Sequence, residues 1–116
     1  MKKKVLHIVE AFGGGVFTFL VDLVNSTCDE YEVVLACSIR PQTPKNYKEY
    51  IDKRVKIIEL KSGVRDISLT KDLKSFFEVK RIIKNENPDI LHLHSSKSGF
   101  LGRMACNDKN IKVLYN

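Results

Sequence analysis

Stretches that favour strands and stretches that favour helices alternate along the whole sequence, and this alternation constrains the fold more than any other feature. Strands with continuous apolar character are expected at 4–9, 31–39, 55–60, 89–94 and 111–115. Helices with an apolar stripe are expected at 17–24, 70–87 and 98–107. Strand–helix–strand connections are right-handed and build parallel sheets covered on both faces. The sequence therefore predicts one α/β domain, a doubly wound parallel sheet in three layers with strand 4–9 at its centre. The connection from Arg40 to Asp52 is expected to be an exposed loop.

Size and composition limit the class of protein. The chain has 116 residues, 43% of them hydrophobic, which suits one globular domain. No apolar run approaches the ~20 residues of a membrane-spanning helix, and Val5–Val9 is too short for a signal peptide. A cytoplasmic protein is therefore expected. Cys28, Cys37 and Cys106 form no Cys-x-x-Cys motif and are predicted to be free thiols.

The charge indicates what the surface can meet. The formal net charge is +6, with lysines scattered along the chain. A basic surface suits a phosphorylated substrate, an anionic lipid or nucleic acid. Because the sequence contains no basic helix with interleaved aromatic residues, no nucleic-acid partner is predicted.

A glycine run follows the first predicted strand, at the edge where parallel sheets bind ligands. Gly13, Gly14 and Gly15 let the backbone turn sharply and let a ligand approach without meeting a Cβ atom. The free N–H groups of the next helix favour an anion, usually a phosphate. A tight turn without a ligand is the alternative that the glycines alone leave open.

Three better-known phosphate motifs do not fit this sequence. A P-loop ends in Gly-Lys-Ser/Thr, but Val16 and Phe17 follow the glycines. A dinucleotide fingerprint requires a third, spaced glycine and an acid near the end of the second strand, where Arg40 stands instead. A phosphorelay receiver requires an aspartate after the third strand, where Lys61 and Ser62 lie. NAD is therefore not expected as a cofactor.

Three histidines raise the question of a metal. His92 and His94 are two residues apart on a predicted strand and so share a face, and His7 lies on a strand that often neighbours it. Three imidazoles could hold zinc, but no Asp or Cys is placed to help them, so no metal site is predicted. His92 is interpreted as a hydrogen-bonded core histidine. His94, at the carboxyl end of its strand, is a candidate ligand contact.

The turn after His94 opens the last predicted helix. Ser95, Ser96 and Lys97 follow the strand directly, and Ser96 or Ser98 can cap the helix. A lysine at a helix N-terminus is unfavourable unless an anion lies nearby, although an exposed, solvated lysine explains it equally well. We therefore take Ser95, Ser96 and Lys97 as candidate substrate-binding residues.

Two blocks carry a resemblance to a known family. These are the segment 4–16, KVLHIVEAFGGGV, and the segment 88–103, PDILHLHSSKSGFLGR, of which the second is the more specific. Together they resemble the amino-terminal domain of the family 4 glycosyltransferases, retaining enzymes of the GT-B fold with two Rossmann-like domains. The resemblance follows the order of elements over essentially the whole chain.

The resemblance implies a function and a site. Residues 1–116 would be the acceptor-side domain, with the carboxyl-terminal donor domain absent, so that this fragment alone is inactive. Gly13, Gly14 and Gly15 would face the diphosphate or the transferred sugar, and His94 to Lys97 would border the acceptor cleft. The full-length enzyme would transfer a sugar from a nucleotide diphosphate sugar to a hydroxyl acceptor. It would act in polysaccharide or glycan assembly, without a metal or other cofactor. The acceptor is often lipid-linked, which a peripheral membrane contact would suit.

Two alternatives stay open at this point. The chain could be a complete flavodoxin-like binding or regulatory module with no chemistry of its own. It could also be the amino-terminal domain of a sugar-nucleotide epimerase, which shares the two-domain architecture. The sequence does not identify the donor, the acceptor, the linkage or the oligomeric state.

Overall fold

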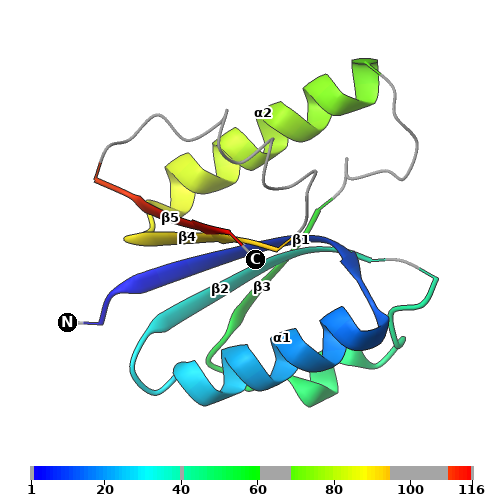
Figure 1. Cartoon of the computed structure of the whole chain (residues 1–116), viewed down its shortest axis with the longest axis vertical. Helices are drawn as coiled ribbons and strands as arrows, with labels where there is room; N and C mark the ends of the chain where they lie inside the picture. The colour runs from blue at the N-terminus through cyan, green and yellow to red at the C-terminus, as the bar shows by residue number, and fades with distance from the viewer. Residues whose placement is uncertain (1, 40, 61–68, 95–109, 116) are drawn as a thin grey trace.

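A computed structural model places five parallel strands in one sheet, in the order β3-β2-β1-β4-β5 (Figure 1). It describes residues 2–39, 41–60, 69–94 and 110–115. The strands are β1 (Lys4–Phe12), β2 (Glu32–Ile39), β3 (Lys56–Glu59), β4 (Ile90–Leu93) and β5 (Lys112–Tyr115). All four pairings are parallel. The predicted parallel sheet with the first strand at its centre is confirmed.

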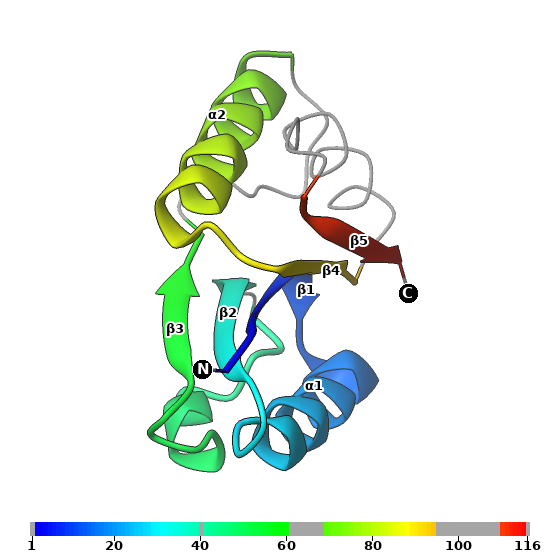
Figure 2. The same ribbon diagram turned by 90° about the vertical axis from the view of Figure 1, so that its left-hand side faces the viewer.

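The two described α-helices cover opposite faces of the sheet. The helix α1 (Gly14–Thr27) lies on one face and α2 (Leu69–Glu86) on the other, which gives the three predicted layers (Figures 1 and 2). At the end of α2, Asn87 adopts a left-handed conformation with φ 47°, and its N–H bonds the Ile83 carbonyl at 2.9 Å. Pro88 follows and prevents the helix from continuing. The helix expected at 98–107 lies outside the described residues.

Each face of the sheet contributes to a separate hydrophobic core. Toward α2, Leu6 and Ile8 of β1 pack with Val79 and Ile83 of the helix. Toward α1, the opposite side chains of the sheet pack with Leu20 and Val24 among others. Because both faces are covered, six successive residues of β2 are buried. A sheet buried on both faces explains the continuous apolar runs in the sequence.

The connection between β2 and β3 differs from the exposed loop that the sequence predicts. It contains a short 3-10 helix, η1 (Tyr47–Tyr50), and Thr43, Tyr47 and Ile51 are buried. The Tyr47 ring meets the Phe12 ring edge-on, with centroids 5.7 Å apart. The predicted loop is therefore partly wrong: polar residues dominate its sequence, but a few apolar side chains extend the core beyond the end of β1.

The cysteine prediction holds for the residues that the structure describes. Cys28 and Cys37 are free and buried, and Cys106 lies outside the described residues. Burial raises the pKa of the Cys37 thiol to about 12, and the nearby Glu59 carboxylate adds to this effect. Cys37 therefore stays protonated at neutral pH and acts as a small apolar core residue.

The core makes a direct stability prediction. We expect Leu6→Ala to lower the free energy of unfolding by about 2–5 kcal/mol, because it leaves a cavity at a fully buried position. Leu114→Ala is the matched control. This leucine is 39% exposed, so the same truncation should cost less than about 1 kcal/mol. Urea unfolding followed by circular dichroism measures both, and equal losses would contradict the assignment of the core.

Candidate functional site

The candidate site lies at the carboxyl edge of the sheet, beyond the ends of β1 and β4. The glycine run leaves β1 at this edge, and His94 follows the last residue of β4 directly. The two strands are hydrogen-bonded neighbours, and the His94 N–H bonds the Ile8 carbonyl at 3.0 Å. The Phe19 ring of α1 also lies edge-on to the His94 ring, with centroids 6.3 Å apart. The end of β4 and the first turns of the helix after the glycines are therefore close in space.

The three glycines have different structural roles. A Cβ atom on Gly13 would lie 2.1 Å from Gln42 Cγ and 3.2 Å from the Gln42 backbone carbonyl carbon, so this position is filled by the neighbouring loop. Gly14 has φ 58°, in the left-handed region that favours glycine. Gly14 and Gly15 are exposed, and a Cβ atom on either would lie more than 4 Å from every described atom beyond its chain neighbours and the adjacent helix backbone. The outer side of the turn is therefore open to a ligand.

Aromatic packing holds this turn in place. Phe12, the last residue of β1, is fully buried, and its ring lies 5.1 Å from the Phe17 ring at the start of α1. The Thr43 hydroxyl donates a hydrogen bond to the Phe12 carbonyl. The residues on both sides of the glycines are thus fixed by the core. A fixed backbone can present its N–H groups to a ligand without first being ordered.

The chemistry available at the turn suits an anion. The first N–H groups of a helix have no acceptor within the helix, and the helix dipole places partial positive charge at this end. The capping residue of α1 is Gly13, which has no side chain to accept a hydrogen bond, and no acidic residue occupies the first turn. The arrangement can therefore receive a phosphate or carboxylate group through backbone N–H groups.

Three histidines lie close together on one face of the neighbouring strands β1 and β4. His7 on β1 is in register with His92 on β4, and His94 lies two residues further along on the same face. His7 Nδ1 and His94 Nε2 are 2.9 Å apart, so the N–H of one ring donates a hydrogen bond to the bare nitrogen of the other. The His92 ring contacts the His94 ring at a tilt of 36°, with a centroid separation of 3.9 Å.

Burial keeps these imidazoles uncharged. Burial, followed by the charges of His94 and His92, lowers the pKa of His7 to about 3. Burial, followed by the charge of His92, lowers the pKa of His94 to about 4. The pKa of His92 is also lowered by burial. At neutral pH all three rings are therefore neutral, and each keeps one nitrogen lone pair.

The histidines differ in part from the sequence interpretation. His92 was expected to be the hydrogen-bonded core histidine, but it is half-buried. The buried, hydrogen-bonded pair is His7 with His94, which are 3% and 9% exposed. This pairing depends on the register of β1 against β4, which no local sequence pattern reveals. The remaining candidates, Ser95, Ser96 and Lys97, lie outside the described residues, and their role stays a prediction.

A hollow of about 420 Å³ lies at the carboxyl ends of β2 and β3. Its lining residues come from these strand ends and from the connection between them: Ile39, Pro41, Thr43, Pro44, Lys45, Tyr47 and Glu59. The Tyr47 hydroxyl donates a 2.6 Å hydrogen bond to Glu59. Burial and this carboxylate raise the pKa of the Tyr47 hydroxyl above its usual range. The sequence does not reveal this hollow, because the polar residues of the connection predict an exposed loop.

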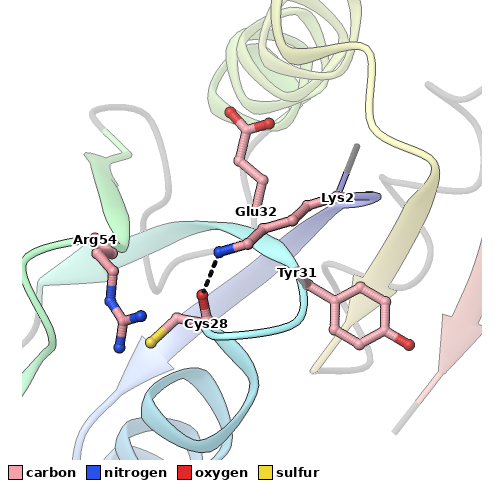
Figure 3. Close-up of a pocket in the computed structure, with 5 residues that line it drawn as sticks. All are labelled: Lys2, Cys28, Tyr31, Glu32 and Arg54. Carbon is pink, nitrogen blue, oxygen red and sulfur yellow. Dashed lines mark hydrogen bonds between the residues drawn. The ribbon is translucent and has the colours of Figure 1, made fainter.

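Another hollow, of about 350 Å³, lies at the amino ends of the strands, away from the glycine turn. Figure 3 shows Lys2 reaching across to the Cys28 carbonyl, at 3.4 Å. The Arg54 guanidinium is already paired with Asp29 and Asp52. Because both cations have partners and the glycine turn is distant, this hollow is not assigned to the candidate site.

The fold and the site together define a class of protein. The domain has three layers, with a parallel sheet in the middle, and is Rossmann-like. An open glycine turn between its central strand and the first helix forms a candidate anion site at the carboxyl edge of the sheet. Residues 4–116 match the family model described as "Glycosyl transferase 4-like". The chain belongs to this family.

Similar proteins agree with this assignment. Over 57 residues, 49% of this chain, the sequence is 44% identical to an Escherichia coli enzyme named UDP-Gal:alpha-D-GlcNAc-diphosphoundecaprenol alpha-1,3-galactosyltransferase. A glycosyltransferase structure from Rickettsia africae matches 98% of the chain with a TM-score of 0.70 and 21% identity. A candidate UDP-N-acetylglucosamine 2-epimerase from Listeria monocytogenes matches 99% with a TM-score of 0.66 and 17% identity. These two structural matches support the fold.

The matched proteins are longer than this chain. The match covers 15% of the Escherichia coli enzyme, 29% of the Rickettsia chain and 30% of the Listeria chain.

Proposed function

We propose that this chain is the amino-terminal, acceptor-side domain of a retaining glycosyltransferase. The whole protein would transfer a sugar, of the hexose type, from a nucleotide diphosphate sugar to a hydroxyl group in polysaccharide or glycan assembly. The observation that carries the proposal is the open glycine turn, Gly13–Gly15, at the carboxyl edge of the sheet. It occurs in a chain that belongs to the glycosyl transferase 4-like family.

The glycine turn is assigned to the donor diphosphate. In such a transfer negative charge builds up on the departing diphosphate, and fixed donors aimed at that charge stabilise the transition state. The N–H groups at the start of α1 are fixed by the packing of Phe12 against Phe17. Gly14 and Gly15 leave open the space that side chains at these two positions would fill. The proposal assigns charge neutralisation to these N–H groups and to cationic side chains, so transfer should persist in EDTA.

The end of β4 is assigned to the acceptor. His94 lies there as a neutral, polar imidazole. The apolar Phe19 ring beside it is 48% exposed. Ser95, Ser96 and Lys97 follow it in the sequence and complete the proposed acceptor border. The Escherichia coli relative is named for an acceptor attached to diphosphoundecaprenol, which favours a lipid-linked acceptor here as well.

The proposed location follows from this acceptor. Among the described residues, neither α1 nor α2 has both the length and the apolar character needed to cross a bilayer. We place the protein in the cytoplasm, in peripheral contact with the inner face of the membrane. The net charge of +6 suits such contact with anionic lipid.

The test uses the whole protein that carries this domain. It is incubated with radiolabelled UDP-sugars and with extracted polyprenyl-diphosphate sugars, with and without EDTA. We expect label to appear in the lipid fraction in both conditions, with the anomeric configuration of the donor retained. Product stereochemistry is read by NMR.

Two other results would each count against the proposal. Conversion of the UDP-sugar to its epimer without any acceptor would assign the domain to a sugar-nucleotide epimerase. Absence of both reactions, with nucleotide bound, would favour a binding module. Heat-treated protein serves as the control for label carried over without catalysis.

A further inference from the structure

We propose that His7, His92 and His94 form a binding site for a divalent transition-metal ion of the zinc type. Sequence spacing alone argued against this site, because no Asp or Cys stood near the histidines. The tertiary structure adds what the sequence does not show, namely that the side-chain nitrogens of these three histidines converge to within 4.8 Å of one another. The inference concerns metal binding by this domain and does not depend on the proposed sugar transfer.

The first support is convergence. The candidate ligand nitrogens of the three rings all lie within 4.8 Å of one another. In a tetrahedral zinc site with Zn–N distances of about 2.0–2.1 Å, the ligand nitrogens lie about 3.3–3.4 Å apart. The His7–His94 nitrogen distance of 2.9 Å is slightly below that value. The adjustment that the proposal requires is rotation of the rings until the three nitrogens surround a common centre.

The second support is the rigidity of the backbone that carries the ligands. His7 and His92 are directly opposite each other in a parallel ladder that runs from Val5 to Ile8 and from Ile90 to Leu93. The His94 N–H is bonded to the Ile8 carbonyl. All three ligands are therefore held by adjacent strands in the middle of the sheet. A preformed site of this kind loses little conformational freedom when the ion binds.

The third support is the chemistry of the donors. Three neutral imidazoles suit zinc, copper or nickel and do not suit magnesium or calcium, which prefer oxygen ligands. Metal binding would replace the hydrogen bond between His7 and His94. The shared proton moves to the other nitrogen of the ring that donated it, so both rings stay neutral and no net proton is released.

The fourth support is an entry path. His7 and His92 line a pocket of about 250 Å³, which Leu23 and Thr27 of α1 also line. His92 is half-buried and so connects the buried rings with solvent. Three histidines with one face open to a pocket leave a fourth coordination position for water or another small ligand.

The test is metal titration of the untagged 116-residue chain, whose histidines are these three alone. We expect calorimetry to give one Zn²⁺ per chain with a micromolar or tighter dissociation constant, and Mg²⁺ to give no heat. Co²⁺ should produce visible absorption bands that Zn²⁺ displaces. His92→Ala changes the least buried ligand and should weaken Zn²⁺ binding at least about tenfold while circular dichroism stays unchanged.

Controls separate this site from other ligands. Cys106→Ser removes a thiol and Asp22→Asn removes an exposed carboxylate of α1, and both variants should bind Zn²⁺ as the parent chain does. Equal affinity of the parent chain and His92→Ala would overturn the proposal. So would the absence of binding at 100-fold excess of Zn²⁺ over a folded chain. If His92→Ala unfolds, the Co²⁺ spectrum of the parent chain becomes the test. A spectrum that shows no imidazole ligands on the bound Co²⁺ would overturn the proposal.

Discussion

The 116-residue chain by itself is expected to transfer no sugar and to bind UDP or UDP-sugars with a dissociation constant of about 1 mM at best. That constant corresponds to about −4 kcal/mol of binding free energy. Among the described residues, a Cβ atom at Gly14 or Gly15 would face open space, so the glycine turn by itself offers a diphosphate one wall. A nucleotide held against one wall keeps most of its hydration and gains few contacts.

Catalysis should be lost more completely than binding. Holding two substrates in reacting geometry contributes roughly 7–11 kcal/mol of barrier lowering in favourable cases. In the proposed enzyme that positioning comes from two domains that close on the donor. The matches cover only 15–30% of the lengths of the matched glycosyltransferases and epimerase, so the 116-residue chain is the right size to test what this one domain contributes.

The measurements are calorimetry with UDP and UDP-sugars, and a radiolabelled transfer assay with a membrane lipid extract. The whole protein, tested in parallel, is the positive control. Micromolar nucleotide binding by the 116-residue chain, or any transfer that depends on it, would show that this domain is self-sufficient and that the two-domain proposal is mistaken.

The second large effect is expected at the glycine turn of the whole protein. Gly14→Val should lower turnover at least about a hundredfold, because bulk placed before the N–H groups blocks the diphosphate and removes charge stabilisation. Gly14 has φ 58°, so valine also strains the turn itself. A loss of activity in this variant alone would therefore mix two causes.

Gly15→Ala separates these causes. A Cβ atom at Gly15 lies more than 4 Å from every described atom beyond its chain neighbours and the adjacent helix backbone. Alanine also favours a helix by about 1 kcal/mol over glycine. The variant should be as stable as the parent or more so, yet its turnover should fall about tenfold if a diphosphate approaches the turn. Ser26→Ala, near the far end of α1, is the matched control and should leave turnover unchanged. Full activity in both glycine variants would mean that the run is only a turn.

The fold could be predicted to a large extent from local pattern. Strands buried on both faces have continuous apolar runs, and the helix between them repeats its apolar residues every three to four positions, so both kinds of element are readable from short windows. Handedness and the preference for short connections then restrict the order of the strands. The buried connection near Tyr47 was missed because only a few of its residues enter the core.

Some features of the candidate site could likewise be predicted from the sequence, and others required the tertiary structure. The sequence by itself determined that a glycine run follows the central strand and that His92 and His94 share a face, since both statements depend on neighbours in the chain. Only the tertiary structure decided that His7 meets His94 at 2.9 Å, across 87 positions of sequence. That contact requires a particular strand order and register, which are set by packing over the whole sheet. Burial in that packed sheet, which the sequence does not show, lowers the pKa of the three histidines and keeps their imidazoles neutral.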